Sequence, residues 1–570
     1  MIYAADFETA TTEPTYVWAW GVEPLDEENF QCGTNIESFF HFVSTCRSGT
    51  VFYFHNLKFD GSFLIQYLLT HGYTYSEEKE GNTFECLITD MNQWYMITVR
   101  MKYRTQKRRE KIKNIYFYDS LKLIPLSIKQ MPKTFGLEME KLEIDYDADE
   151  DGNYFLTEEK KKYLKHDVEI LKNSLITMFE HGINKMTMAA SAFSDLRERF
   201  GKQKFERFFP RIAEREILET SLKDLTLEEQ QELSADKRLR KAYRGGWCYL
   251  RKGLEEKELK DVYVYDVNSL YPFIMNTKPL PFGKPIINES IEPVPNYDLQ
   301  VIQLSCAFEI KEGYLPTIQI KKSMLFNPTE YLESSNGEIV WLSVTSVDYQ
   351  LMIEHYDLYD LEIEKVYHFR SATRLFSEYI EFWNHVKELS QDNPGLRFIA
   401  KRMNNSCYGK FATSPVRIKR VPELQDGVLK FHNLPPTYEP GYYLPVGIFI
   451  TSWARDYIIR HAQAHQDHFV YCDTDSLHLD EPCNDIPIDD RKLGYFKLEK
   501  KFDRAKYIRA KRYIGEKDGV LQVTCAGLPA TCHDQVTFDN FKTGTVYTGK
   551  LLQKQVVGGV ILTETSFLLK

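Results

Sequence analysis

Alternating apolar and polar positions over the first 185 residues predict a domain of strands and helices. Tyr3–Glu8 and Tyr116–Asp119 carry the two-residue period of extended strands. Gly61–His71 and Glu158–Glu180 carry the wider period of helices with one apolar face. Strands that alternate with helices are typical of an α/β domain. A charged segment at about 190–242, predicted to be mainly helical, connects this domain to the rest of the chain.

Two long insertions divide the remainder of the chain. They cover 278–375 and 412–444, and the second is rich in Pro and Gly. Within the second insertion, Arg417–Val421 and Val428–Phe431 have the pattern of two short strands on either side of the turn signal Gln425-Asp426-Gly427. We therefore expect a hairpin there. With 570 residues, the chain is long enough for two to four domains.

Two carboxylates mark the tip of a second predicted hairpin. Asp473 and Asp475 interrupt an apolar alternation that runs from Phe469 to Leu479. Residues two apart on an extended strand share a face, so both side chains are expected to point to one side. A capped loop would explain this turn alone, but Asp266 ends another alternating strand and can face it. Because Mg²⁺ prefers a few carboxylate oxygens together with water and phosphates, the three acids predict a metal centre.

A separate set of acids lies in the N-terminal domain. Asp6 and Glu8 are two apart on a predicted strand and share a face. Asp60 lies where a strand leads into a helix, and Tyr163 and Asp167 are four apart on another helix. Singly, each acid fits a surface residue or a helix cap. Together they could hold two metal ions about 3.5–4 Å apart, the arrangement that binds the attacking and leaving oxygens of a phosphodiester.

Polar side chains repeat along one predicted helix that lies, in the sequence, between Asp266 and the Asp473/Asp475 hairpin. Arg397, Lys401, Asn405 and Tyr408 are spaced by four, four and three residues and would form one stripe. A solvated helix face is the simpler interpretation of the stripe by itself. Beside a metal centre, the two cations suit a triphosphate and the ring suits stacking on a base. The combination predicts phosphoryl transfer by positioning and charge neutralisation.

The charge distribution points to a polyanionic partner. The net charge of −10 alone disfavours nucleic acid. However, Arg100–Lys113 and Lys497–Arg512 each contain eight basic residues, and the last thirty residues contain four lysines against one glutamate. Solvated faces would explain any single run. Three such runs on a chain with carboxylate clusters favour a track for a polyanion.

The ten cysteines are scattered, and none forms a Cys-x-x-Cys pair. This spacing argues against zinc and against a disulfide framework. No apolar run is long enough to span a bilayer, and the first residues lack the charged and apolar regions of a signal peptide. A reducing cytoplasm is the expected compartment.

Nine short motifs follow one another in a fixed order. The N-terminal acids lie in Asp6-Phe7-Glu8, Asn56–Asp60 and Tyr163-x-x-x-Asp167. The later metal and phosphate residues lie in Asp266–Pro272, Lys401–Gly409 and Tyr471–Ser476. Three further motifs are Tyr243–Gly246, Thr451–Arg455 and Lys511-Arg512-Tyr513. In these motifs, none of them degenerate, the chain resembles the family B DNA polymerases of the small protein-primed type found in Bacillus phages and linear plasmids. They correspond to the three exonuclease motifs, the three polymerase motifs, and the linker, template and primer-end motifs of that family.

The resemblance covers nearly the whole chain and implies a multidomain fold of class α/β and α+β. It consists of an RNase H-like exonuclease domain joined to a right-hand polymerase of palm, fingers and thumb, with two insertions where this family carries its terminal-protein regions. The expected divisions are the exonuclease domain at 1–187, the linker and first palm segment at 188–277, the first insertion at 278–375, the fingers at 376–411, the second insertion at 412–444, the palm at 445–530 and the thumb at 531–570.

The resemblance also implies a role for each motif residue. The exonuclease metals would be bound by Asp6, Glu8, Asp60 and Asp167, with Lys141 and Tyr163 orienting or stabilising the attacking group. The polymerase metals would be bound by Asp266, Asp475 and the Val267 carbonyl, with Asp473 as a further catalytic acid. The nucleotide would contact Val267, Tyr271, Arg397, Lys401, Asn405 and Tyr408. DNA would be bound by Thr9, His55, Asn56, Phe59, Phe63, Ser120, Leu121, Tyr146, Tyr243, Gly245, Gly246, Thr451, Arg455, Lys511 and Tyr513.

The implied function is a DNA-directed DNA polymerase with 3′→5′ proofreading, protein-primed initiation and strand displacement, which replicates a linear viral or plasmid genome. Its expected cofactor is Mg²⁺, two ions per active site, with Mn²⁺ as a substitute. The expected partners are primer-template and single-stranded DNA, deoxynucleoside triphosphates and a terminal protein, with no membrane, and the chain is expected to be a monomer in the bacterial cytoplasm. Two alternatives are a nuclease with an inactive polymerase half, which the intact motifs disfavour, and a non-enzymatic DNA-binding protein, which would not need acids that repel phosphate.

Overall fold

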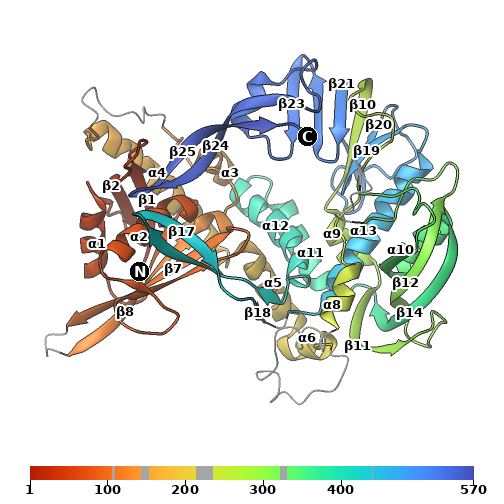
Figure 1. The fold of residues 1–570 in the computed structure, drawn as a ribbon, viewed down its shortest axis with the longest axis horizontal. Coiled ribbons are helices and arrows are strands. Elements are labelled where there is room, and N and C mark those ends of the chain that lie inside the picture. The colour runs from red at the N-terminus through yellow and green to blue at the C-terminus, as the bar shows by residue number, and fades with distance from the viewer. Residues whose placement is uncertain (105–108, 143–152, 213–234, 321–329, 440) are drawn as a thin grey trace.

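The structure is a computed structural model that describes residues 1–104, 109–142, 153–212, 235–320, 330–439 and 441–570. Its larger sheets have eight, seven and four strands, and each is covered by helices (Figure 1). These elements agree with the predicted α/β and α+β class. Within the described residues, no helix is long and apolar enough to cross a membrane.

The N-terminal domain is built on the eight-stranded sheet. The strand order is β3-β2-β1-β4-β8-β7-β6-β5, and the central strands β1, β4 and β8 are parallel. The carboxyl ends of these three strands therefore lie at one edge of the sheet. The strands are β1 Ile2–Thr9, β2 Val17–Pro24, β3 Gln31–Gly33, β4 Thr50–Phe54, β5 Thr74–Tyr75, β6 Thr83–Ile88, β7 Trp94–Arg104 and β8 Glu110–Asp119.

Helices cover both faces of this sheet. α1 (Ile36–Thr45) and α2 (Leu57–Thr70) pack on one face, and α4 (Glu158–Glu180) packs on the other. The predicted helix Glu158–Glu180 is confirmed. α2 begins at Leu57, earlier than the predicted start at Gly61, because Asn56 adopts a left-handed conformation and turns the chain directly from β4 into the helix.

The two faces of β1 belong to different cores. Tyr3, Ala5 and Phe7 pack with α1 and α2, whereas Ala4 packs with α4. Side chains alternate along a strand, so the even-numbered positions that follow Ala4 also face α4. This alternation directs the two acids of β1 towards the helix that carries the next motif.

The central sheet is antiparallel and has seven strands in the order β23-β22-β21-β10-β20-β19-β9. Its strands are β9 Cys248–Leu250, β10 Glu258–Val267, β19 Phe469–Asp473, β20 Ser476–Leu479, β21 Phe496–Arg509, β22 Arg512–Lys517 and β23 Val520–Cys525. The helices of this region are α5 Met188–Phe200, α6 Lys202–Phe208, α8 Asp236–Leu239, α9 Leu270–Thr277, α11 Ser377–Leu389, α12 Pro394–Ser406 and α13 Leu444–Ala464. α9 and α13 pack on one face of the sheet and share the core that contains α4.

The first insertion forms a small domain with its own core. Four strands pair in the order β11-β14-β12-β13, and α10 (Ser346–His355) packs against them. The strands are β11 Leu280–Asn288, β12 Leu299–Ile310, β13 Val340–Thr345 and β14 Tyr356–Ala372.

The second insertion forms a long two-stranded arm, Val416–Tyr438. The predicted hairpin is confirmed as β16 (Arg420–Gln425) and β17 (Val428–Asn433), with positive φ at both Asp426 and Gly427, as a two-residue turn requires. The first strand begins at Arg420 instead of Arg417, because β15 (Val416–Arg417) pairs with β18 (Thr437–Tyr438) at the base of the arm.

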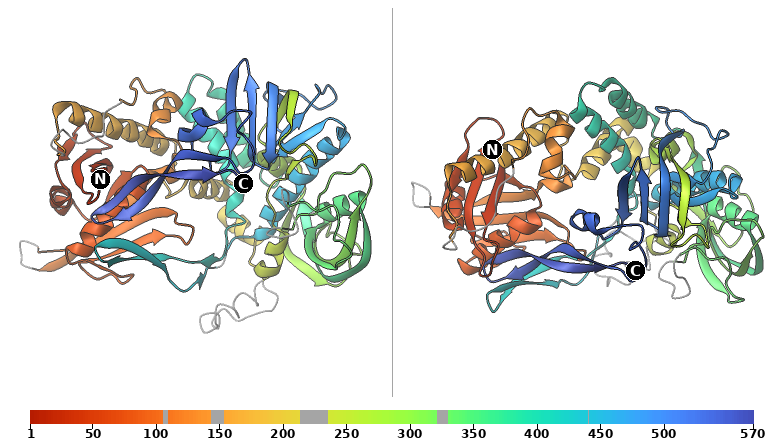
Figure 2. Two further views of the ribbon diagram at one scale, coloured as in Figure 1. Left: turned by 45° about the horizontal axis from the view of Figure 1, so that its top comes forward. Right: turned by 90° about the horizontal axis from the view of Figure 1, so that it is seen from above.

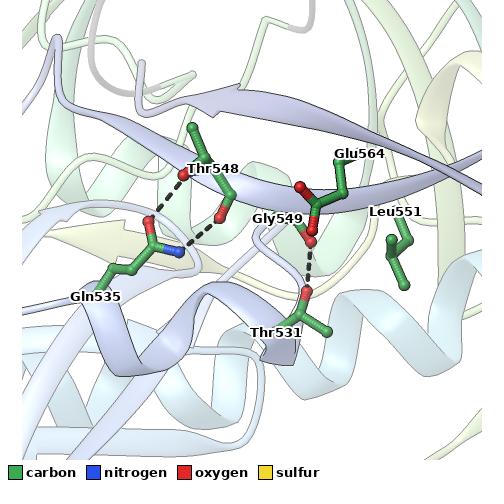
Figure 3. A pocket seen from close by; sticks show the side chains of 6 residues that line it. All are labelled: Thr531, Gln535, Thr548, Gly549, Leu551 and Glu564. Atoms are coloured by element: carbon green, nitrogen blue, oxygen red, sulfur yellow. Dashed lines mark hydrogen bonds between the residues drawn. The ribbon is translucent and has the colours of Figure 1, made fainter. Parts of the chain in front are cut away.

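A C-terminal hairpin of β24 (Val546–Val556) and β25 (Gly559–Leu568) leaves the far end of the central sheet. Its base is fixed to a short 3₁₀ helix (Figure 3). The Gln535 side chain donates to the Thr548 carbonyl at 2.6 Å and accepts from the Thr548 N–H at 3.1 Å. The Thr531 hydroxyl donates to the Gly549 carbonyl at 2.7 Å.

The tips of the hairpin and the arm meet on the N-terminal domain (Figures 1 and 2). Val428 of the arm pairs with Val557 at the hairpin turn. The Thr15 N–H donates to the Val557 carbonyl at 3.1 Å, and the Gln66 amide donates to the Gly427 carbonyl at 2.9 Å. Leu429 is fully buried in the core of the N-terminal domain. The arm and the C-terminal hairpin thus meet each other and the N-terminal domain. Together with the central sheet, these segments form a closed ring, which is called the ring below.

Candidate active sites

The N-terminal acids meet at the sheet edge where β1 and β4 end. β1 directs Asp6 and Glu8 towards α4, which carries Tyr163 and Asp167, and Asp60 lies in the first turn of α2. Glu8, Asp60 and Asp167 are 7%, 4% and 5% exposed. The structure thus brings together the acids of the N-terminal domain that the sequence predicted to form one cluster.

Negative charges oppose one another in this buried cluster. Burial and the Asp167 carboxylate raise the pKa of Asp6 to about 7, although the Lys141 ammonium opposes the shift. Burial and the charge of Asp6 raise the pKa values of Glu8 and Asp60 well above their usual range. A divalent cation would reverse these shifts, because its charge favours the ionised carboxylates.

Lys141 lies at the edge of the acid cluster. Its Nζ is 2.6 Å from Asp167 Oδ2 and 5.3 Å from the centre of the Tyr163 ring. Asp167 Oδ1 is buried and lacks a hydrogen-bond partner among the described residues. A buried carboxylate oxygen without a partner, beside other acids, is a donor that a Mg²⁺ ion would satisfy. The residues present therefore fit a divalent metal.

His55 and Asn56 organise the loop beside these acids. His55 Nδ1 is 3.0 Å from the Ser120 hydroxyl, and His55 Nε2 is 2.7 Å from the Leu126 carbonyl. Burial lowers the pKa of His55 to about 4, so the ring is neutral near pH 7. The Asn56 N–H donates to Asp119 Oδ1 at 3.1 Å. These contacts hold β4 and β8 together where they reach the cluster.

The other predicted DNA contacts of this domain differ in exposure. Thr9, Phe59 and Leu121 are partly exposed around the cluster. Phe63 is 1% exposed and lies beneath Gly559 of the C-terminal hairpin, where an added Cβ would be 2.3 Å from the ring. Tyr146 lies outside the described residues. DNA binding by this set stays a prediction.

The second centre lies where β10 meets the β19–β20 hairpin. The predicted hairpin is confirmed, but Asp475 lies in its turn, after Thr474 with φ 67°. The expectation that one extended strand carries both Asp473 and Asp475 is therefore wrong. β10 pairs with β20 so that Asp266 lies opposite Ser476, next to Asp475.

The turn places Asp475 against the end of β10 and leaves Asp473 on a different side. The Val267 N–H donates to the Asp475 carbonyl at 2.8 Å. Asp473 accepts from Lys511 Nζ at 2.5 Å and from the Cys248 thiol at 3.0 Å. Asp266 and Asp475 thus lie close to each other, whereas Asp473 is already paired with Lys511 and the Cys248 thiol.

Electrostatics distinguish the three acids further. Burial, together with the charges of Asp266 and Asp473, raises the pKa of Asp475 to about 7. Burial also raises the pKa of Asp266. Burial alone would raise the pKa of Asp473, but hydrogen bonds from Lys511 and the Cys248 thiol hold it below its usual value. Asp266 and Asp475 therefore fit a divalent metal, whereas Asp473 positions the lysine.

Tyr271 and Tyr408 lie side by side next to this centre. Their ring centres are 4.3 Å apart. Burial raises the pKa of both tyrosines, and the charge of Asp475 makes a smaller contribution in the same direction. The prediction of one helix through Tyr408 is wrong, because α12 ends at Ser406 and Tyr408 begins a 3₁₀ turn. The turn brings the ring towards Tyr271 at the start of α9.

Four cations lie near Asp266. Arg397 and Lys401 are exposed on α12, and the Lys401 charge lowers the pKa of Asp266. Lys497 Nζ is 3.4 Å from Asp266 Oδ2. Burial lowers the pKa of Lys387, and the three other cations lower it further. A cluster of this kind is suited to a polyphosphate. Lys387 was not predicted, because α11 carries no sequence motif. Lys497 stood out in the sequence only as part of a basic run.

Asn405 lies on α12 one turn beyond Lys401. Its Oδ1 is buried and lacks a hydrogen-bond partner in the described part of the chain. Tyr513 on β22 stacks on Tyr507, with ring centres 5.2 Å apart, beside Lys511. Their roles towards nucleotide and primer stay predictions.

The linker motif Tyr243–Gly246 lies directly against the hairpin turn. The Thr474 N–H donates to the Trp247 carbonyl at 2.9 Å. A Cβ added to Gly246 would lie 2.5 Å from the Thr474 side chain, so only glycine permits this approach. The motif therefore sets the position of the turn that carries Asp475.

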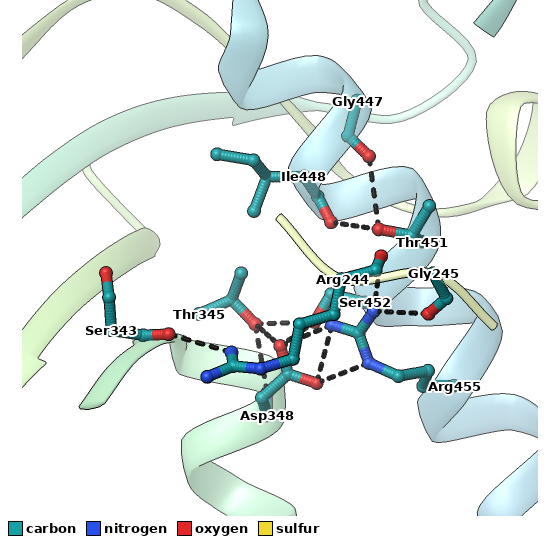
Figure 4. Close-up of polar contacts among 10 residues, drawn as sticks. All are labelled: Arg244, Gly245, Ser343, Thr345, Asp348, Gly447, Ile448, Thr451, Ser452 and Arg455. Atoms are coloured by element: carbon teal, nitrogen blue, oxygen red, sulfur yellow. Dashed lines mark hydrogen bonds and ion pairs between the residues drawn. The ribbon is translucent and has the colours of Figure 1, made fainter. Parts of the chain in front are cut away.

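Arg455 holds the same linker from inside the protein (Figure 4). It is 2% exposed and donates to the Arg244 and Gly245 carbonyls, both at 2.9 Å. Its other nitrogens bind the Asp348 carboxylate at 2.6–3.0 Å. Thr451 is also buried and donates to carbonyls of its own helix. DNA contact by Thr451 and Arg455 stays a prediction; their described contacts are with the protein.

Comparisons with known proteins agree with this geometry. The family model for DNA polymerase type B, organellar and viral, matches residues 46–153 and 144–492. The DNA polymerase of Bacillus phage B103 is 38% identical over 596 residues, covering 100% of this chain and 99% of the relative. The DNA polymerase of Streptococcus phage Cp-1 is 32% identical, covering 99% of this chain and 98% of the relative.

Solved structures give the same result. The phi29 DNA polymerase complexed with primer-template DNA and incoming nucleotide substrates superimposes with a TM-score of 0.89 at 36% identity, and the match covers 100% of both chains. The phi29 enzyme complexed with single-stranded DNA matches with a TM-score of 0.88 over the same extent. The predicted multidomain fold is confirmed.

Charge repulsion in the N-terminal cluster predicts a metal-dependent stability. The unfolded-state pKa of Asp6 is near 3.8 and the folded-state value is about 7, so ionisation destabilises the folded state as pH rises between these values. In EDTA at pH 8, Asp6→Asn should raise the melting temperature by a few degrees, since burial and repulsion of the ionised Asp6 together cost at most ~4 kcal/mol. At pH 4 the difference should vanish.

Differential scanning fluorimetry measures this effect, and Asp26→Asn, at an exposed acid of the same domain, is the control without an expected change. Mg²⁺ should stabilise the wild type more than Asp6→Asn. A lower melting temperature for Asp6→Asn in EDTA at pH 8 would contradict the repulsion.

Proposed function

The chain belongs to the organellar and viral type B DNA polymerases, and we propose that it combines DNA synthesis with 3′→5′ proofreading in two separate active sites. The observation that carries the proposal is the pair of carboxylate clusters on two different sheets, each with acids whose pKa is raised to about 7. Such clusters suit metals that neutralise phosphate, and they would be a needless cost in a protein that only binds DNA.

In the polymerase site, Asp266 and Asp475 would hold Mg²⁺, which when bound favours the ionised primer hydroxyl and the leaving phosphate. The cations Lys387, Arg397, Lys401 and Lys497 would bind the triphosphate. Tyr271 and Tyr408 would border the sugar and base, with Asn405 at hand for a polar contact. Asp473 keeps Lys511 beside the metal site, where lysine and Tyr513 would hold the primer end.

In the exonuclease site, Asp6, Glu8, Asp60 and Asp167 would hold the metals. Lys141 would orient Asp167 through its 2.6 Å contact. Tyr163, on the same face of α4 as Asp167, would position the attacking water. Partly exposed Phe59 would stack on a base of the frayed strand.

Protein-primed initiation is the third part of the proposal. It rests on the resemblance and on the insertion domain, which has its own core and contacts the linker through the Ser343 carbonyl, which accepts from Arg244 at 2.8 Å. The terminal protein would supply a hydroxyl in place of a primer end. Transfer of labelled dAMP to a purified terminal protein in the presence of Mg²⁺ tests this step.

The two activities should separate by mutation. Asp475→Ala should abolish primer extension, a loss of at least about 10³-fold, and leave primer degradation intact, because its carboxylate belongs only to the second cluster. Asp6→Ala with Glu8→Ala should do the reverse. Gel analysis of a labelled primer-template with and without nucleotides measures both activities. If each folded variant loses both activities, the assignment of two sites fails.

Tyr271 should exclude ribonucleotides. Its ring packs on Tyr408 beside Asp475, where it can close against the C2′ edge of the sugar, and a 2′-hydroxyl would clash or stay unpaired. Tyr271→Val should raise ribonucleotide use relative to deoxynucleotide use by about 10–100-fold in kcat/KM. Tyr263→Val, on β10 three residues before Asp266, serves as the control. Unchanged discrimination by Tyr271→Val would exclude this role.

The arm should be required for strand displacement and processivity but not for the chemical step. It contributes none of the carboxylates, and it closes the ring with the C-terminal hairpin. Replacement of 414–442 by a short Gly/Ser linker should leave single-nucleotide addition nearly intact and reduce rolling-circle products to short lengths. Leu429→Asp, which places a charge in the buried contact of the arm, should have the same effect in milder form. Products of many circle lengths from the replacement variant would contradict the proposal.

A further inference from the structure

A histidine, a cysteine and an aspartate that belong to neither carboxylate cluster meet at the end of α13. His465 is the C-cap of α13, and Cys483 and Asp485 lie in the loop after β20. The Cys483 Sγ is 2.9 Å from His465 Nε2 and 2.8 Å from Asp485 Oδ1, and His465 Nε2 is 2.8 Å from the same oxygen. Three ligand atoms of different residues thus face one point.

The surroundings prepare the histidine as a ligand. His465 Nδ1 lies 2.7 Å from the His461 carbonyl, which can only accept, so Nδ1 carries the proton. The lone pair of neutral histidine is then on Nε2, which faces Cys483 and Asp485. A backbone carbonyl that fixes the tautomer in this way is the usual support of a metal-bound histidine.

Protons alone satisfy the cluster poorly. With a neutral imidazole protonated at Nδ1 and an ionised Asp485, the triad has one proton, on the thiol, for three short contacts among Nε2, Sγ and Oδ1. A cation at their centre would satisfy all three at once. Metal bonds of 2.0–2.3 Å separate tetrahedral ligands by ~3.3–3.8 Å, so the three atoms must move apart by roughly 0.5–0.9 Å. Asp485, whose side chain is 78% exposed, can move away from the other two ligands. The 2.9 Å distance between Sγ and Nε2 widens only through a shift of Cys483 or His465.

We propose that His465, Cys483 and Asp485 bind a divalent zinc-like cation that has a structural role, with water as the fourth ligand. Imidazole, thiolate and carboxylate together favour Zn²⁺ or Co²⁺ over Mg²⁺, which prefers oxygen only. The ligands are eighteen and two residues apart, so this site departs from the prediction against zinc, which considered only Cys-x-x-Cys spacing.

The cation would tie α13 to the strand of the polymerase metal centre. The Cys483 N–H donates to the Tyr265 hydroxyl at 2.8 Å, and Tyr265 precedes Asp266 on β10. α13 also carries Arg455, which holds the linker beside Asp475. A metal bond between these elements would fix the loop after β20 and stabilise the folded chain without taking part in the reaction.

Cobalt provides a test that the active-site acids do not obscure. Metal-free full-length protein titrated with Co²⁺ should develop the thiolate-to-cobalt charge-transfer band and tetrahedral d–d bands with one equivalent, and Zn²⁺ should remove them. Cys483→Ser should abolish the charge-transfer band, and His465→Ala should weaken the Co²⁺ binding that this band reports at least tenfold. One equivalent of Zn²⁺ should raise the melting temperature of the wild type by ~2 °C or more and that of Cys483→Ser by less.

Two matched controls define the outcome. Cys248→Ser removes the thiol beside Asp473, and His468→Ala removes a histidine that pairs with Asp480 at 3.0 Å near the cluster; both should retain the band. Circular dichroism and primer extension with Mg²⁺ establish that the Cys483→Ser variant is folded. A band that is absent in the wild type, retained in Cys483→Ser, or lost in Cys248→Ser would overturn the proposal.

Discussion

The mutual repulsion of buried carboxylates is the constraint around which this protein is built. Burying one unpaired carboxylate is costly, and placing several together is more so. The fold meets this constraint twice with rigid elements. In the N-terminal domain, parallel β1 and β4 with the first turn of α2 bring the acids to one sheet edge. In the central sheet, the β19–β20 turn holds Asp475 against the end of β10. At both places a lysine, Lys141 or Lys511, neutralises one acid and leaves the others for a cation.

The second cluster depends on a buried ion pair between distant parts of the chain. Arg455 of α13 binds Asp348 of the insertion domain and holds the carbonyls of Arg244 and Gly245. Removing either partner would leave a buried charge unpaired, which costs several kcal/mol. The Gly245–Gly246 segment in turn touches Thr474 at the hairpin turn. A chain of direct contacts therefore links the insertion domain to the turn that carries Asp475, although the domain contributes no acid to the cluster.

Local sequence patterns predicted many of the helices and strands and the residues of the motifs. They failed for residues whose position depends on contacts with distant parts of the chain. The period of Glu158–Glu180 predicted α4 with its observed ends, and the spacing of Asp6 and Glu8 predicted their common face. The spacing of Asp473 and Asp475 misled, because a left-handed residue between them turns the chain. Lys387, Asp348 and the His465–Cys483 contact have no local signal, since their partners come from other segments. The burial of Arg455 also has no local signal, because its partners Asp348, Arg244 and Gly245 come from other segments.

Helix α2 connects the ring to the first acid cluster. Its first turn carries Asp60 of the acid cluster and the adjacent Phe59. Phe63 follows Phe59 by one turn on the same face, with ring centres 5.8 Å apart. On this face Ser62 accepts from Gln555 of the C-terminal hairpin at 3.0 Å, and Phe63 lies beneath Gly559. Gln66, one turn further, binds the arm. Because these residues share one short helix, contacts that close the ring also fix the orientation of Asp60. Ring closure and the geometry of the N-terminal acid cluster are thus set by the same helix.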